Sequence, residues 1–169
     1  NYCFDIAGGA NAKSEGDNLR LGPADTSTGK IFEIKKDGDA YKIIAVQSGK
    51  VLDIEGKSTA DGANIHQWTD LGQNNQLWIF EDDPIAENCY YIHAVQGGWM
   101  DAAGCVNGYT PRPDGSTNVY SWSYTGAKNQ MWILEKVEND TSATGSAISE
   151  GNVWIVAAVG VAAVIAVAA

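Results

Sequence analysis

The hexapeptide at residues 75–80, NQLWIF, returns later in the chain at residues 129–134 as NQMWIL. In both copies a Gln and a Trp stand at the same spacing inside a short apolar run that is typical of a strand. A repeated motif of this kind has two explanations. It forms part of a binding site, or it is the way in which the fold repeats its core, and the surrounding sequence bears on both.

The similarity extends well beyond the hexapeptide. The matching segments are residues 41–49 with 90–98, 51–53 with 99–101, and 64–68 with 118–122. A weaker third copy precedes these two, and its Asp5 stands at the same spacing before Asp53 as Asp53 stands before Asp101. Self-similarity at a fixed period indicates one structural unit that is copied, each copy burying its apolar face against the others.

The pattern inside each copy predicts β-structure. Short apolar or alternating runs rich in Val, Ile, Tyr and Trp are separated by clusters of Gly, Asn, Asp and Ser, which predicts strands joined by turns, four in each complete copy. No long stretch before residue 153 shows the apolar spacing of an amphipathic helix. Three such copies predict a closed or nearly closed antiparallel barrel with pseudo-threefold symmetry, because closure removes the exposed edges of the sheet.

These residues resemble the ricin-type β-trefoil lectins. The resemblance lies in three copies, a Gln-x-Trp near the end of both complete copies, an Asp near the second strand and an aromatic residue on the third. It covers residues 1–137 and implies an all-β trefoil of twelve strands. It also implies carbohydrate binding, commonly of galactose-type sugars, in shallow pockets, one in each repeat that keeps its pocket residues.

The resemblance assigns one sugar site to the second repeat. It implies Asp53 as the acceptor for sugar hydroxyls, Trp68 as the stacking platform, and Asn75 and His66 as further polar contacts. A pyranose has an apolar face of C–H groups that packs on an aromatic ring, and rim hydroxyls that need fixed partners. The third repeat supplies the equivalent residues Asp101, Tyr120, Trp122 and Asn129.

The first repeat departs from the pattern. Gly22 replaces the aromatic residue, Gly29 replaces the Asn, and residues 30–32 (KIF) replace Gln-x-Trp, so no sugar site is expected there. This copy also lacks a counterpart of residues 41–49. Three explanations are open: the strand lies before residue 1, the barrel has eleven strands, or a partner supplies the strand by edge pairing.

Each candidate site residue also has a structural explanation. Asp53 and Asp101 recur with Asp5, whose copy has lost the other pocket residues, so an Asp here also suits a turn cap. Trp68 and Trp122 also suit the barrel wall. The large residues of the motif itself are expected in the core, because continuous apolar strands need them there; they are Phe32, Trp78 and Trp132.

The segment at residues 153–169, VWIVAAVGVAAVIAVAA, has no charged residue. As a helix it spans roughly 25 Å, close to the hydrocarbon thickness of a bilayer. We predict a single transmembrane helix there, with a flexible polar linker at residues 138–152 and the trefoil on the lumenal or extracellular side. Small residues along one helix face suit other membrane subunits as neighbours. The alternatives are a buried core helix and a cleaved signal for a glycolipid anchor.

Composition and the remaining motifs argue against several other functions. The net charge is −10 and no dense Lys/Arg cluster is present, so nucleic acid is not an expected partner. The spacing of Cys3, Cys89 and Cys105 does not resemble a zinc site; Cys89 and Cys105 pair, or all three thiols are reduced. With His66 and His93 the only histidines, no catalytic residues, metal or cofactor are predicted.

Two functions therefore remain from sequence alone. The first is a membrane-anchored lectin with two sugar sites, in the second and third repeats. The second is a single-pass accessory subunit of a larger membrane complex, whose trefoil docks protein and binds no sugar. The pockets kept in two repeats favour the first function, whereas the small-residue face of residues 153–169 and the eroded first repeat favour the second.

Overall fold

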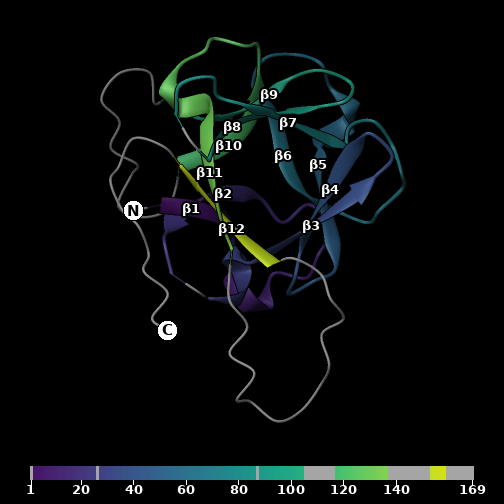
Figure 1. The fold of residues 1–169 in the computed structure, drawn as a ribbon. Helices are drawn as coiled ribbons and strands as arrows, with labels where there is room; N and C mark the ends of the chain where they lie inside the picture. The colour runs from purple at the N-terminus through teal and green to yellow at the C-terminus, as the bar shows by residue number, and fades with distance from the viewer. Residues whose placement is uncertain (1, 26, 87, 105–116, 137–152, 159–169) are drawn as a thin grey trace.

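The structure, a computed structural model, describes residues 2–25, 27–86, 88–104, 117–136 and 153–158. These residues form strands and short 3-10 helices (Figure 1). The first repeat contains β1 (Tyr2–Ile6), β2 (Leu19–Pro23) and β3 (Phe32–Asp37). The second contains β4 (Ala40–Ala45), β5 (Lys50–Ile54), β6 (Ala63–Trp68) and β7 (Trp78–Asp82). The third contains β8 (Cys89–Ala94), β9 (Trp99–Ala102), β10 (Thr117–Trp122) and β11 (Met131–Lys136). The 3-10 helices are η1 (Gly9–Asn11), η2 (Thr28–Lys30), η3 (Glu55–Lys57) and η4 (Lys128–Gln130).

The pairing of the strands repeats with the sequence. β4 pairs with β3, β5 and β7, and β8 pairs in the same way with β7, β9 and β11. All these pairs are antiparallel, and the strand that carries the repeated Asp pairs with the next strand in each repeat: β1 with β2, β5 with β6, and β9 with β10. The predicted all-β trefoil is confirmed. Equivalent residues of different repeats can therefore be compared position by position.

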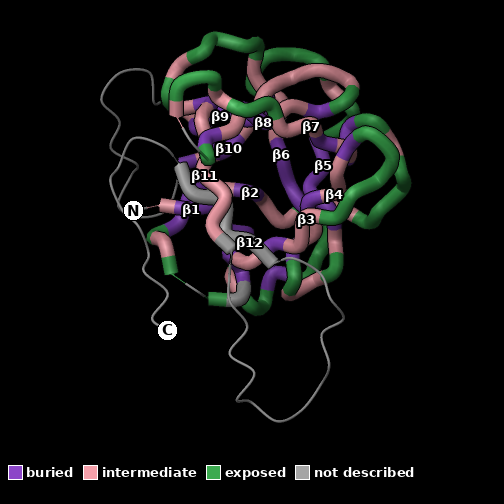
Figure 2. The backbone as a smooth tube through the Cα atoms, in the orientation of Figure 1, coloured by how far each residue is buried: buried purple, intermediate pink, exposed green. Residues whose placement is uncertain are grey.

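The core lies where the strands converge. Trp78, Trp132 and Phe32 are completely buried, as predicted, and the ring of Phe4 packs on that of Trp132 at 4.6 Å. Each core Trp also has a partner for its indole N–H; Trp78 Nε1, for example, donates to the main-chain carbonyl of Leu52 at 3.1 Å. Figure 2 shows buried residues along the strands and exposed residues in the loops. Large aromatic residues thus fill the barrel interior without leaving a polar atom unpaired.

The structure corrects the prediction for the C-terminal segment. Val153–Ala158 is strand β12 rather than the beginning of a helix. None of the described residues belongs to a helix long and apolar enough to cross a membrane. A continuous apolar run is also typical of a strand packed inside a sheet, so the apolar composition of this segment does not distinguish a strand from a helix. The transmembrane prediction is wrong for residues 153–158, whereas 138–152 and 159–169 lie outside the described residues.

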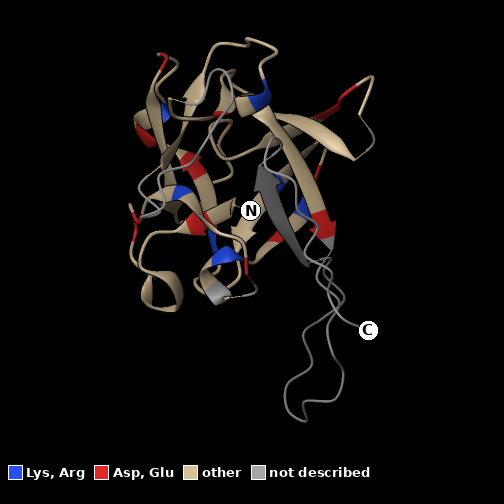
Figure 3. Ribbon diagram, turned by 90° about the vertical axis from the view of Figure 1, so that its left-hand side faces the viewer, with Lys and Arg blue, Asp and Glu red and all other residues tan. Residues whose placement is uncertain are grey.

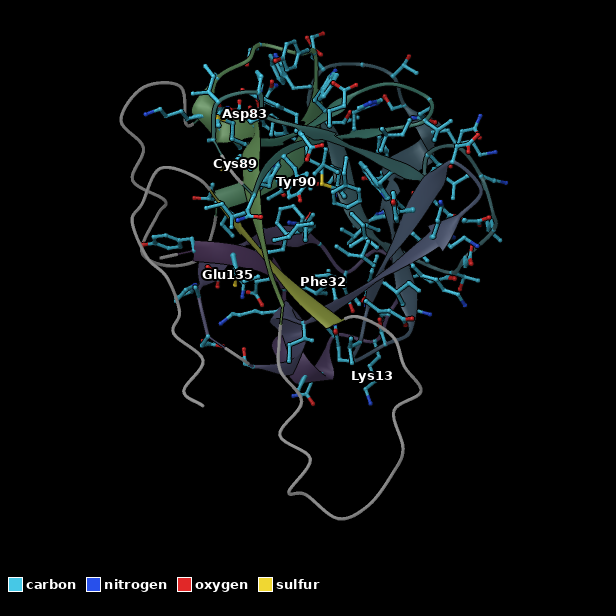
Figure 4. The ribbon with its side chains drawn as sticks, viewed as in Figure 1. Lys13, Phe32, Asp83, Cys89, Tyr90 and Glu135 are labelled. Atoms are coloured by element: carbon cyan, nitrogen blue, oxygen red, sulfur yellow. The ribbon has the colours of Figure 1, made fainter. Side chains whose placement is uncertain are left out.

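β12 occupies the place of the strand that the first repeat lacks. It pairs with β1, β3 and β11, as β4 pairs with β5, β7 and β3. In the backbone register Trp154 is the partner of Phe32, as Tyr41 is the partner of Trp78, and Figure 4 labels Phe32 beside β12. The trefoil therefore continues beyond its predicted end at residue 137. The chain itself completes the first repeat, an explanation that the three sequence-based alternatives did not include.

The sequence of β12 fits this place. Residues 154–158 read WIVAA, and their counterparts read YKIIA at 41–45 and YYIHA at 90–94. All three have an aromatic residue first, Ile or Val third and Ala fifth, the period of two that places residues on one face of a strand. The first strand of each repeat thus has one pattern, whichever part of the chain supplies it.

Candidate functional site

The second repeat holds a carboxylate that is fixed from several sides. Asp53 lies on β5 and is 5% exposed. Its Oδ2 accepts hydrogen bonds from Asn75 Nδ2 at 2.9 Å and from Gln76 Nε2 at 2.8 Å. His66, directly opposite on β6, places Nε2 3.2 Å from Oδ1. Hydrogen bonds from the two neighbouring amides hold this carboxylate in one orientation.

A pocket of about 640 Å³ opens beside this carboxylate. Trp68 is partly exposed, and its ring stacks on that of His66 at 5.3 Å with an angle of 20° between the planes. The lining residues are Asp53, Glu55, Gly56, Lys57, His66, Trp68, Leu71, Gln73 and Asn75. The structure therefore brings together all four residues predicted for the second repeat, and adds the residues of η3 and of the loop after β6.

The buried residues of this set differ in role from those that line open space. His66 is 6% exposed and Asn75 is 3% exposed. Asn75 Nδ2 donates to Asp53 Oδ2 and to the main-chain carbonyl of Ile54, the latter at 3.0 Å. Asn75 and His66 therefore both hold the carboxylate in place, and His66 also supports the Trp68 ring. Gln76 also holds the Asp53 carboxylate in place, although the sequence analysis assigned it only to the repeated pattern of the fold. The signal for it was that a Gln recurs with Asp53 and with Asp101 and is replaced by Lys30 in the repeat of Asp5, which has lost the other site residues.

Gln76 also shapes the loop that borders the pocket. It is completely buried; its Nε2 donates to the carbonyl of Thr69 at 2.9 Å, and its Oε1 accepts from the main-chain N–H of Leu71 at 2.8 Å. One side chain therefore links the loop after β6 to the carboxylate of β5. Gln130 does the same in the third repeat, where it bonds Ser123, Thr125 and Asp101. The motif thus unites a core Trp with a Gln that builds the site.

The third repeat carries the same arrangement around Asp101. The carboxylate, 3% exposed, accepts from Asn129 Nδ2 at 2.8 Å and from Gln130 Nε2 at 3.0 Å. Tyr120 lies opposite Asp101 on β10, and its ring is 5.2 Å from that of Trp122. Burial raises the pKa of Asp101 to about 6, against the hydrogen bonds from Gln130, Asn129 and Tyr120, which lower it. All four predicted residues again lie together.

The first repeat replaces the site with an ion pair. Arg20, in the place of His66 and Tyr120, donates from Nε to Asp5 Oδ2 at 2.8 Å. A Cβ atom on Gly22 would lie 2.8 Å from the Asp5 carboxylate, and one on Gly29 would lie 2.7 Å from the Cα of Gly9. There is no room here for the Trp and Asn of the other repeats, and the absence of a sugar site in this copy stays a prediction.

Other chemistries find little support among the described residues. No group of His, Cys, Asp and Glu there is arranged to hold a metal ion. Cys3 and Cys89 are buried free thiols. The predicted alternative of a Cys89–Cys105 pair involves Cys105, which lies outside the described residues. Burial raises the pKa of the Cys3 thiol to about 12, so it stays protonated. In the view of Figure 3, basic residues are interspersed with acidic ones on the ribbon.

Comparison with known proteins agrees with this geometry. Residues 1–68 and 28–108 match the family model described as ricin-type beta-trefoil lectin domain-like. The chain belongs to this family. The match includes the whole second-repeat site and Asp101 of the third. Among curated proteins, none matches the chain significantly.

Several solved structures share the family fold. The designed threefold-symmetric protein ThreeFoil has a TM-score of 0.68 and 28% identity, over 78% of this chain and 89% of ThreeFoil. An exo-beta-1,3-galactanase from Clostridium thermocellum has a TM-score of 0.65 and 23% identity, over 78% of this chain and 29% of the enzyme. A Polyporus squamosus lectin, solved with a Neu5Aca2-6Galb1-4GlcNAc epitope, has a TM-score of 0.58 and 21% identity, over 80% of this chain and 49% of the lectin. The last two likenesses concern the fold, and this chain spans less than half of either protein.

Proposed function

We propose that this chain binds carbohydrate through the site residues of its second and third repeats. The observation that carries the proposal is the lining of the second-repeat pocket, where a carboxylate fixed by two amides and the partly exposed ring of Trp68 face the same 640 Å³ space. Membership of a lectin-like family supports it. The sugar class that the resemblance implies is galactose-type.

The chemistry of the pocket suits a single pyranose ring. The C–H face of the sugar would pack on Trp68, while a hydroxyl at the rim would donate to Asp53, an acceptor already held in place. A hydrogen bond to a charged group contributes about 1.5–3 kcal/mol. Because the pocket offers one such group and one ring, each site would be weak, and two sites on one chain would gain from multivalent ligands.

Titration calorimetry with galactose, followed by a wider panel of monosaccharides, tests the proposal on the whole chain. We expect Trp68→Ala and Trp122→Ala each to remove one site and the double variant to remove both. Ile85→Ala is the matched control, because Ile85 is 93% exposed and outside the pocket lining. If the unaltered chain binds none of these sugars, or if the double variant binds as well as the unaltered chain, the proposal is wrong.

Placement at a membrane is a separate prediction. It required a helix over residues 153–169, and β12 now occupies the first part of that range, so the functional proposal is confined to carbohydrate binding. A lumenal or extracellular location, and a role as accessory subunit, stay predictions. Fractionation of cells that express the tagged chain, with a protease-protection step, distinguishes a lumenal from a cytosolic domain.

A further inference from the structure

We propose that the third repeat has a second sugar platform, formed by Tyr91, His93, Trp99 and Tyr124, and therefore binds two rings of an oligosaccharide. This inference rests on the proposed function. It assigns to the third repeat a ligand longer than the single ring that the second-repeat pocket accommodates. We call these four residues the aromatic cluster.

The aromatic cluster is a set of rings in mutual contact. The ring of Trp99 lies 4.3 Å from that of His93 and 4.6 Å from that of Tyr124. Tyr91 meets Tyr124 edge to face at 5.3 Å. Tyr91 is 7% exposed and Tyr124 is 55% exposed, so the cluster has a buried base and an outer ring that presents its surface to solvent. Sequence reasoning missed it, because its members come from β8, β9 and the loop after β10.

The equivalent positions of the second repeat show that the fold does not require these rings. Lys42 stands in the place of Tyr91, and Asp70 in the place of Tyr124, and these two form an ion pair at 2.7 Å. The counterparts of Trp99 and His93 there are Val51 and Ile44. A charged pair and two aliphatic side chains therefore suffice for the same backbone. The needs of the backbone therefore do not explain why the third repeat has four aromatic residues at these positions.

The aromatic cluster adjoins the third-repeat site residues Asp101 and Trp122. Trp99 lies directly opposite Trp122 in the β9–β10 pair, and Asp101 follows Trp99 by two residues, on the same face of β9. Tyr124 follows Trp122 by two residues in the chain. A ligand that stacks on Trp122 and bonds Asp101 is thus beside the cluster, and its next ring is the natural occupant of the exposed Tyr124 surface.

The rim of the cluster has the polar groups that a sugar needs. His93 Nε2 lies 3.2 Å from Glu81 Oε1, and the Glu81 side chain is 55% exposed. The carboxylate offers accepting oxygens next to aromatic rings, which is the combination found around Asp53 and Trp68. Burial raises the pKa of Tyr91 to about 12, so its hydroxyl stays protonated and donates to the carbonyl of Gly126 at 3.4 Å, which fixes the loop that carries Tyr124. Figure 4 labels Asp83 directly after β7, and Cys89 and Tyr90 at the start of β8.

The test compares ligands of different length on a chain that keeps only the third-repeat site. In a Trp68→Ala background, galactose and β-1,3-linked galactose oligomers of two to four units are titrated. We expect the disaccharide to bind about tenfold more tightly than galactose, the contribution of one aromatic contact. Tyr124→Ala is expected to abolish that gain and to leave the galactose affinity unchanged.

Tyr124→Phe is the matched control, since it keeps the ring and is expected to keep the gain with chain length. Equal affinities for galactose and its oligomers would overturn the second platform while leaving the proposed function intact. A gain that survives Tyr124→Ala, or a Tyr124→Ala variant that weakens galactose and oligomers equally, would also overturn it. Absence of binding to any of these sugars in the Trp68→Ala chain would overturn the second platform as well, and the proposed function fails with it only if the unaltered chain also binds none of the monosaccharide panel.

Discussion

The raised pKa of Asp101 predicts that sugar binding in the third repeat depends on pH. The ionised carboxylate is the form that accepts a sugar hydroxyl. With a pKa of about 6, about nine in ten of these groups are ionised at pH 7 and about one in ten at pH 5. In the Trp68→Ala background we therefore expect the galactose affinity to fall about tenfold between pH 7 and pH 5, or about 1.4 kcal/mol.

Titration calorimetry at half-unit steps from pH 5 to pH 8 measures this dependence. Asp101→Asn is the control, because its amide does not titrate in this range, so whatever affinity remains is expected to be independent of pH. An affinity in the Trp68→Ala chain that is constant between pH 5 and pH 8 would refute the reasoning. So would a tenfold change that persists in Asp101→Asn, since another group would then be responsible.

The same group makes a prediction about folding. Because the pKa of Asp101 is higher in the folded chain than its ordinary value of 3.8, folding favours the protonated form. The contribution of Asp101 to stability is therefore complete below pH 3.8 and is lost as pH rises through 6. Urea unfolding at pH 4, 5, 6 and 7 is expected to show this loss in the unaltered chain relative to Asp101→Asn.

Three further predictions concern the scaffold and are measured by urea unfolding. Trp78→Ala removes a completely buried ring and is expected to lower the free energy of unfolding by about 3–5 kcal/mol; a loss below about 1 kcal/mol would contradict its place in the core. Gly22→Ala places a Cβ 2.8 Å from the Asp5 carboxylate, and we expect a cost of about 1–3 kcal/mol. Ala157→Pro in β12 removes a main-chain donor opposite Ile133 and is expected to destabilise the chain by about 1–3 kcal/mol, whereas an unchanged midpoint would show that β12 does not contribute to stability.

Much of the fold could be predicted because it is repeated. The spacing of Asp5, Asp53 and Asp101 and the alternating apolar runs indicated three copies of one strand unit, and the structure confirms them. The tail could not be assigned by composition, since residues 153–158 are apolar at every position and give no period to separate strand from helix. The pattern of an aromatic residue, Ile or Val, and Ala at alternate positions was the available signal, and it becomes evident only after alignment with 41–45 and 90–94.

The candidate site was predictable in its members and not in their roles. Asp53, Trp68 and their copies were identified from the resemblance, and the structure brings each set together. The burial of His66 and Asn75, and the bonds of Gln76 to the carboxylate, depend on how the loop after β6 folds back over β5. Because such contacts join residues that are distant in the sequence, no local sequence pattern predicts them.

The closure of the barrel by β12 has a consequence for the order in which the molecule folds. β1 is made before all the other described strands, and one of its two neighbours, β12, is made after all of them. Contacts of such large sequence separation slow folding, because the loop entropy must be lost before the pairing compensates for it. During synthesis the nascent first repeat would present unpaired edges of β1 and β3 for longer than the other repeats, so it is the part of the chain for which a chaperone has most time to bind.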